Sequence, residues 1–125
     1  MATHQNSMAA NEQLIVALGY CALLFIIALI FQKYPPKKIN WMYGYRTNRS
    51  MKNETIWRAA NSYSMDLMLK VCGLSFLLPV FLYFLYDPYL LMITIIVHTL
   101  LILSVFLFTE MYLDKHFNSD GAAKE

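Results

Sequence analysis

The residues best suited to chemistry lie between positions 33 and 61, in the one segment that combines cations, aromatic rings and hydrogen-bonding groups. Seven of the ten Lys and Arg residues fall here, against a single acid, Glu54. Arg46 and Arg49 stand near its centre. A guanidinium offers five donors in a fixed plane, which match a carboxylate, a phosphate or the free carbonyls at a helix end. The segment therefore favours recognition of an anion or of a helix terminus.

Two interpretations of this segment remain open. In the structural one, Arg46 and Asn61 tie an irregular loop onto helix ends, while Tyr45 and Trp57 pack at a membrane interface. In the other, Arg46, Arg49 and the aromatic residues form a binding surface for a lipid headgroup or for an anionic or amphipathic peptide. The residue types alone fit both interpretations.

Further polar residues fall within or beside the apolar parts of the chain, at Asp66, Lys70, His98 and Glu110. An uncompensated charge at the middle of a bilayer costs about 3 kcal/mol or more, so each of them needs an explanation. Asp66 and Lys70 have the spacing that pairs charges on one helix face. In an antiparallel hairpin, Glu110 comes within reach of Lys70. We expect these three charges to form a cluster, either for mutual compensation or for proton or peptide sensing.

His98 lies near the middle of an apolar run. A neutral imidazole that is hydrogen-bonded to a neighbouring helix is one interpretation, and we expect that arrangement. A proton switch or a ligand contact is the alternative, because the imidazole is the side chain that titrates near neutral pH. Cys21 and Cys72 lack the spacing of a metal site and are expected to be small packing residues.

Enzyme chemistry finds little support in the sequence. There is no HExxH, no GxSxG, no nucleotide-binding glycine pattern and no group of carboxylates with metal-ligand spacing. We expect no catalysis, no cofactor and no bound metal. The cation-rich segment contains Pro, Trp and Tyr and lies between apolar runs, which favours a membrane surface and not nucleic acid as its partner.

The elements that carry these residues are apolar runs, at Leu14–Phe31, Val71–Tyr86 and Tyr89–Thr109. The chain is 58% hydrophobic and 14% charged, too apolar for an ordinary small soluble domain. The first and third runs would reach roughly 27 and 31 Å as helices, close to the thickness of the hydrocarbon core. The sequence predicts an all-α membrane protein with three transmembrane helices, at about residues 14–32, 67–86 and 89–110. These form one domain, residues 14–113, between polar tails at 1–13 and 114–125.

The loop between the first two spans has clear boundaries. Pro35 and Pro36 end the first helix, and Asn53 followed by Glu54 has the pattern of a helix start. From Glu54 onward no Pro or Gly interrupts the chain until Gly73. We expect a short interfacial helix here that leads into the second span, which Pro79 is expected to kink.

The distribution of Lys and Arg predicts the orientation. The N-terminal tail and the turn at Asp87 and Pro88 hold none, whereas the long loop holds seven and the C-terminal tail holds Lys115 and Lys124. Cation-rich short loops stay on the cytoplasmic side. We therefore expect the N-terminus outside, and the long loop and the C-terminus inside, a bacterial inner membrane.

Part of this chain resembles a known pattern, made of Asn40, Gly44, Tyr45, Arg46, Thr47, Ser50, Asn53, Trp57 and Asn61. It is similar to the signature of the SdpI/YfhL family of small bacterial membrane proteins. The resemblance extends over roughly residues 15 to 112 and implies a multi-span membrane protein whose signature residues are candidates for binding. The chain is shorter than the family's immunity protein and has Asn48 where many relatives have Pro.

The family's named example protects a toxin-producing cell from its own secreted peptide toxin. The resemblance therefore implies an immunity protein that binds a membrane-active peptide toxin, or the target of that toxin, within the bilayer. The alternative is a small oligomeric transporter or lipid-binding subunit, in which His98 and the Asp66, Lys70 and Glu110 cluster line a polar path. The expected partners are the lipid bilayer, a peptide toxin and a second copy of the chain.

Overall fold

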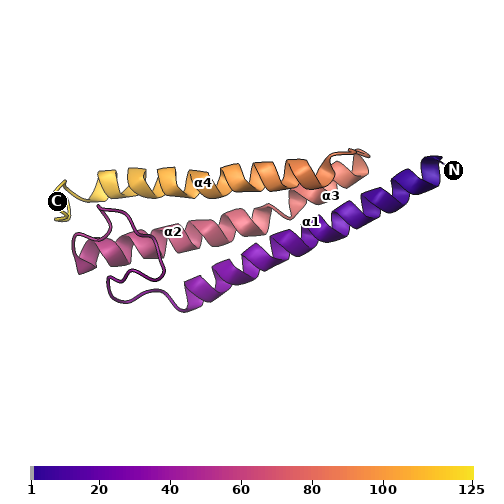
Figure 1. The fold of residues 1–125 in the computed structure, drawn as a ribbon. Coiled ribbons are helices and arrows are strands. Elements are labelled where there is room, and N and C mark those ends of the chain that lie inside the picture. The colour runs from indigo at the N-terminus through magenta and orange to yellow at the C-terminus, as the bar shows by residue number, and fades with distance from the viewer. Residues whose placement is uncertain (1) are drawn as a thin grey trace.

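A computed structural model describes residues 2–125, with side chains from residue 9 onward. Its helices are α1 (Ala2–Lys33), α2 (Glu54–Leu74), α3 (Leu77–Phe84) and α4 (Leu90–His116). Figure 1 shows that α2 and α3 together form one interrupted rod, with α1 and α4 running in the opposite direction beside it. The predicted all-α architecture is confirmed. The loop and the C-terminus lie at one end of the bundle, called here the loop end, and the α3–α4 turn lies at the other, the turn end.

Three segments are long and apolar enough to cross a membrane: Ala9–Lys33, Glu54–Phe84 and Leu90–His116, of 25, 31 and 27 residues. This confirms the three predicted spans. At about 1.5 Å per residue, each exceeds the roughly 30 Å hydrocarbon core of a bilayer. Parts of these helices must therefore reach beyond the hydrocarbon. Helix α1 also continues back through the segment predicted as a polar tail, to Ala2.

Asn53 begins helix α2, as its sequence predicts. Its backbone is extended, and its side-chain Oδ1 accepts a hydrogen bond from the Ile56 amide at 3.0 Å. The helical segment expected before the second span is present and is continuous with α2, which runs without interruption to Leu74. Trp57 and Asn61 therefore stand on the same rigid helix that enters the bilayer.

The second span breaks at Ser75, four residues before Pro79. Proline cannot donate a backbone hydrogen bond, and its ring clashes with the carbonyl four residues earlier. The Ser75 carbonyl instead accepts from the Leu78 amide at 3.3 Å and from the Cys21 thiol at 3.8 Å. The predicted kink is thus a break between α2 and α3. Cys21 and Cys72 are both buried and free, as expected for packing residues.

The bundle interior is lined by small and polar side chains. Helix α1 contributes Ala17, Cys21 and Ala28, each at most 3% exposed. From α4, the residues Thr94, His98 and Thr109 are fully buried. Many large apolar side chains instead face outward along all three spans, whereas Ile56, Trp57, Leu90 and Leu113 are buried. Small residues allow helices to approach closely in lipid, where apolar burial gives little drive for association.

Candidate functional site

The loop from residue 34 to 53 is held against α2 by Asn61, whose side chain is 1% exposed. Its Oδ1 accepts from the Tyr45 amide at 2.6 Å, and its Nδ2 donates to the Trp57 carbonyl at 2.9 Å. Gly44 precedes this contact with φ +111°. A Cβ at Gly44 would lie 2.6 Å from Asn61 Oδ1 and 2.8 Å from Pro36 Cγ. Only glycine combines this backbone conformation with so close an approach.

Trp57 fixes the beginning of the loop. Its ring is fully buried, and its Nε1 donates to the Pro36 carbonyl at 2.8 Å. Next to it, Ile56 and Ala60 form an apolar cluster with Leu113 of α4. Trp57 therefore joins the start of the loop to α2 from inside the protein and is not exposed at the interface.

Three more signature residues shape the loop itself. The Asn40 side chain accepts from the amides of residues 42 and 43, at 2.9 and 3.0 Å. Thr47 and Ser50 bond reciprocally, each side-chain oxygen accepting from the other's amide at 3.1 and 2.9 Å. The Ser50 hydroxyl, fully buried, also donates to the Tyr45 carbonyl at 2.9 Å. Such local side-chain bonds stabilise turns, which lack the regular backbone hydrogen bonds of a helix or a sheet.

Tyr45 links the loop to α4. Its hydroxyl donates to Glu110 Oε1 at 2.6 Å, and its ring lies 5.9 Å from that of Phe106. Burial, followed by the hydrogen bond and the charge of Glu110, raises the pKa of Tyr45 well above its ordinary value. The phenol therefore stays protonated and remains a donor to the carboxylate at any physiological pH.

Replacing Tyr45 by phenylalanine is expected to lower the free energy of unfolding by about 1.5 to 3 kcal/mol, because a hydrogen bond to a charged group is lost. The ring would remain in place, so the loss reports on the hydroxyl alone. Thermal unfolding of the detergent-solubilised protein measures it. A Tyr43→Phe variant is the control, since the Tyr43 hydroxyl makes only a 3.4 Å contact to a carbonyl on the loop surface. Equal unfolding temperatures for both variants would contradict the assignment.

The two central arginines have different roles. Arg46 is exposed and donates to the Trp41 carbonyl within the loop. Arg49 pairs with Asp114 and donates to the carbonyls of Leu113 and Phe117, at 3.4 and 3.1 Å. We expected Arg46 to bind the carbonyls at a helix end. In the structure, Arg49 makes that contact.

The C-terminal segment folds back onto the loop, a contact that was not predicted from the sequence. Phe117 is 6% exposed and packs in the cluster that contains Leu113. Asn53 Nδ2 donates to the Gly121 carbonyl at 2.9 Å, and Lys52 donates to the Ser119 carbonyl. The available signal was a single Phe in a polar tail, followed by a glycine, which has φ +89° here.

The predicted charge cluster forms only in part. Lys70 and Asp66 pair at 2.8 Å across one helical turn, as expected. Their side chains are 67% and 53% exposed on the outward face of α2. In the part of the chain that the structure describes, no ion pair joins Glu110 to them, because Glu110 turns to Tyr45. The hydrogen bond that Tyr45 offers replaces the one expected from Lys70.

His98 is fully buried and meets the Tyr20 ring edge-on at 5.3 Å between centroids. Among the described residues, neither of its ring nitrogens has a hydrogen-bond partner, nor does the buried Thr94 hydroxyl. The hydrogen bond expected from His98 to a neighbouring helix is therefore not formed in the described part of the chain. Within the described chain, His98, the exposed pair of Asp66 and Lys70, and Glu110 against Tyr45 occupy three separate environments.

Comparisons with known proteins found a matching family and a similar relative. Residues 37–109 match the SdpI/YfhL protein family. The chain is 43% identical over 60 residues to the uncharacterized protein YfhL of Bacillus subtilis (strain 168). The aligned segment covers 45% of this chain and 54% of that relative. The match thus spans about half of that relative's length. No solved structure matches this chain.

Proposed function

This chain belongs to the SdpI/YfhL family of membrane proteins, and from that premise we propose that it protects its cell against a membrane-active peptide toxin. It is a multi-pass membrane protein, and we place it in the bacterial inner membrane with the N-terminus outside and the loop end in the cytoplasm. The seven loop cations support this orientation. Protection would come from binding the toxin or its target in the bilayer, and it requires no catalysis.

The observation that carries this proposal is the exposed surface at the tip of the loop, which the buried signature residues hold in place. The polar groups of Asn61 and Ser50 are engaged inside the protein. At the tip of the loop, in contrast, Trp41 and Met42 are 82% and 87% exposed. Arg46 lies against the backbone of this tip, because it donates to the Trp41 carbonyl. An exposed aromatic and apolar tip next to a cation suits an amphipathic peptide at a membrane surface.

Protection can be tested by expressing the protein in a toxin-sensitive strain and measuring survival against a panel of membrane-active peptides. We expect the wild-type protein to raise survival against at least one of them. Replacing both Trp41 and Met42 by serine is expected to abolish that gain at unchanged protein level, because neither side chain supports the fold.

A Tyr86→Ser variant is the matched control, since Tyr86 is 89% exposed at the turn end of the bundle. It should protect as well as the wild-type protein. Unchanged killing across the panel by cells that contain the wild-type protein would count against immunity. Full protection by the variant that lacks Trp41 and Met42 would exclude the loop tip as the contact.

A further inference from the structure

The loop cations separate into engaged and free groups. Arg46 and Arg49 donate to carbonyl or carboxylate oxygens, and so does Lys52. Lys37 and Arg58 are both exposed, and among the residues that the structure describes they have no hydrogen bond or ion pair. Two cations without a hydrogen bond or ion pair to the described residues are available to a ligand.

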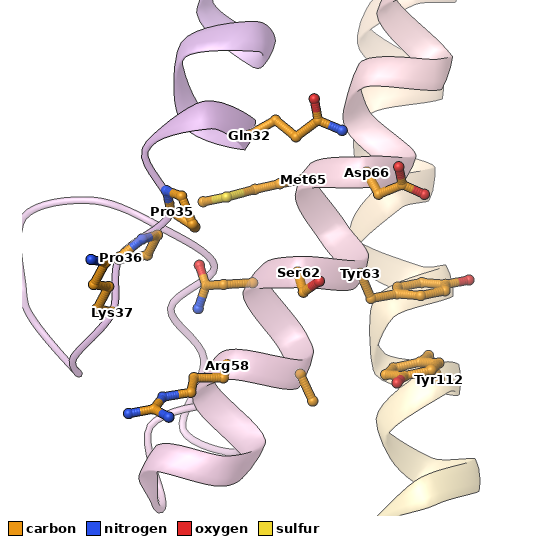
Figure 2. Close-up of a pocket in the computed structure, with 12 residues that line it drawn as sticks. Gln32, Pro35, Pro36, Lys37, Arg58, Ser62, Tyr63, Met65, Asp66 and Tyr112 are labelled. Atoms are coloured by element: carbon orange, nitrogen blue, oxygen red, sulfur yellow. The ribbon is translucent and has the colours of Figure 1, made fainter.

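Lys37 and Arg58 line the same open cleft, of about 800 Å³, between the end of α1 and the outward face of α2. Figure 2 shows both side chains on one side of α2, with Ser62 one turn along from Arg58. Gln32 reaches toward α2 from the end of α1 (Figure 2). The cleft therefore combines two free cations with a hydroxyl and an amide, all of which can donate to oxygen atoms of an anion.

The length of the second span places this cleft at the depth of lipid headgroups. The segment Glu54–Phe84 has 31 residues, whereas about 20 cross the hydrocarbon. With Phe84 near the boundary at the turn end, the first ten or so residues extend beyond the hydrocarbon at the loop end. Arg58 and Ser62 lie in that part, and the exposed Leu74 and Leu77 lie deeper on the same rod.

From this juxtaposition we propose that the cleft binds the headgroup of an anionic glycerophospholipid, with its phosphate between Lys37 and Arg58. Asp66, the acid in the cleft, is already paired with Lys70, so the free charge there is positive. The Ser62 hydroxyl and the Gln32 amide are placed to meet the remaining headgroup oxygens. The acyl chains would extend along the apolar outward face of α2 and α3. This site is separate from the loop tip and does not depend on a role in immunity.

The proposal can be tested by titrating the full chain, purified in detergent, with phosphatidylglycerol or phosphatidylcholine and following the bound lipid by native mass spectrometry. We expect phosphatidylglycerol to bind with the lower apparent dissociation constant. In the Lys37→Gln and Arg58→Gln double variant, its affinity should fall about 30-fold, which corresponds to about 1 kcal/mol for each cation. Affinity for phosphatidylcholine should change little.

A double variant with Lys38→Gln and Lys115→Gln is the matched control, because it removes two exposed cations outside the cleft. It should keep the preference for phosphatidylglycerol. An equal loss in both double variants would overturn the site, because general attraction would then explain the binding. Equal wild-type binding of the two lipids would also overturn it and would leave the cleft to an acidic peptide. Competition by inorganic phosphate as effective as that by the lipid would overturn the choice of a lipid.

Discussion

Replacing Trp57 by alanine is expected to lower the free energy of unfolding by about 3 to 5 kcal/mol, the usual loss for a large aromatic residue in a packed core. The Trp57 ring is fully buried, and its Nε1 donates to the Pro36 carbonyl at 2.8 Å. The substitution leaves a cavity on α2 beside the start of the loop, together with an unsatisfied Pro36 carbonyl. Both losses fall at the one place where the loop leaves α1.

The second tryptophan of the chain supplies the control. Trp41 is 82% exposed, so the same change to alanine there is expected to cost no more than about 0.5 kcal/mol. Thermal unfolding in detergent should show a fall of roughly 10 °C or more for Trp57→Ala and almost none for Trp41→Ala. Trp57→Phe should lie between them, because it keeps most of the ring and loses the donor. Equal unfolding temperatures for the two alanine variants would contradict the buried position of Trp57.

The spans could be predicted from the sequence because a membrane helix satisfies its backbone hydrogen bonds locally, and only length and apolar character decide whether it can cross. The start of α2 was predictable for a similar reason, since Asn53 caps an amide three residues away. Contacts between the helices and the loop were predicted less accurately from the sequence. An antiparallel hairpin gives the depth of Glu110 beside Lys70 but not the face of the helix on which each lies. In the structure Glu110 turns to Tyr45, 65 positions away in sequence.

The fold of the loop was beyond prediction because it depends on close approaches between distant residues. Asn61 and Tyr45 are 16 positions apart, and nothing in their local sequence specifies that contact. The backfolded C-terminal segment is a similar case, in which Phe117 finds its apolar partners only after α2 and α4 have packed. The signature could be recognised in the sequence as a set of residues. The structural role of each residue, however, follows only from the contacts that it makes in the fold.

The structure shows which signature residues are engaged inside the protein. The side chains of Asn61, Trp57 and Ser50 are all at most 1% exposed and are engaged in internal hydrogen bonds. These side chains build the loop from inside the protein. Candidates for recognition are therefore their exposed neighbours, above all Trp41 and Lys37. A loss of function caused by a signature substitution should be accompanied by a loss of protein, whereas a substitution in the exposed set should not.

At Gly44, the addition of a single methyl group is expected to cause a large loss in the free energy of unfolding. A change to alanine is expected to cost roughly 3 to 5 kcal/mol, from backbone strain together with a lost hydrogen bond. The backbone there has φ +111°, and the new methyl group would lie 2.6 Å from Asn61 Oδ1. Asn61 would have to move, and the buried bond from the Tyr45 amide would break. Unfolding temperature and protein level in the membrane should both fall.

Gly19→Ala is the matched control for this prediction. Gly19 lies within α1, where nothing stands within 4 Å of an added Cβ, so alanine should leave stability unchanged or raise it by up to about 1 kcal/mol. A double-mutant cycle identifies the cause, because removing the Asn61 side chain also removes one of the two closest clashes. The loss in the Gly44→Ala and Asn61→Ala double variant should therefore fall short of the sum of the single losses by at least about 1 kcal/mol. Strictly additive losses would show that the close approach of Gly44 to Asn61 does not contribute to the cost of the change.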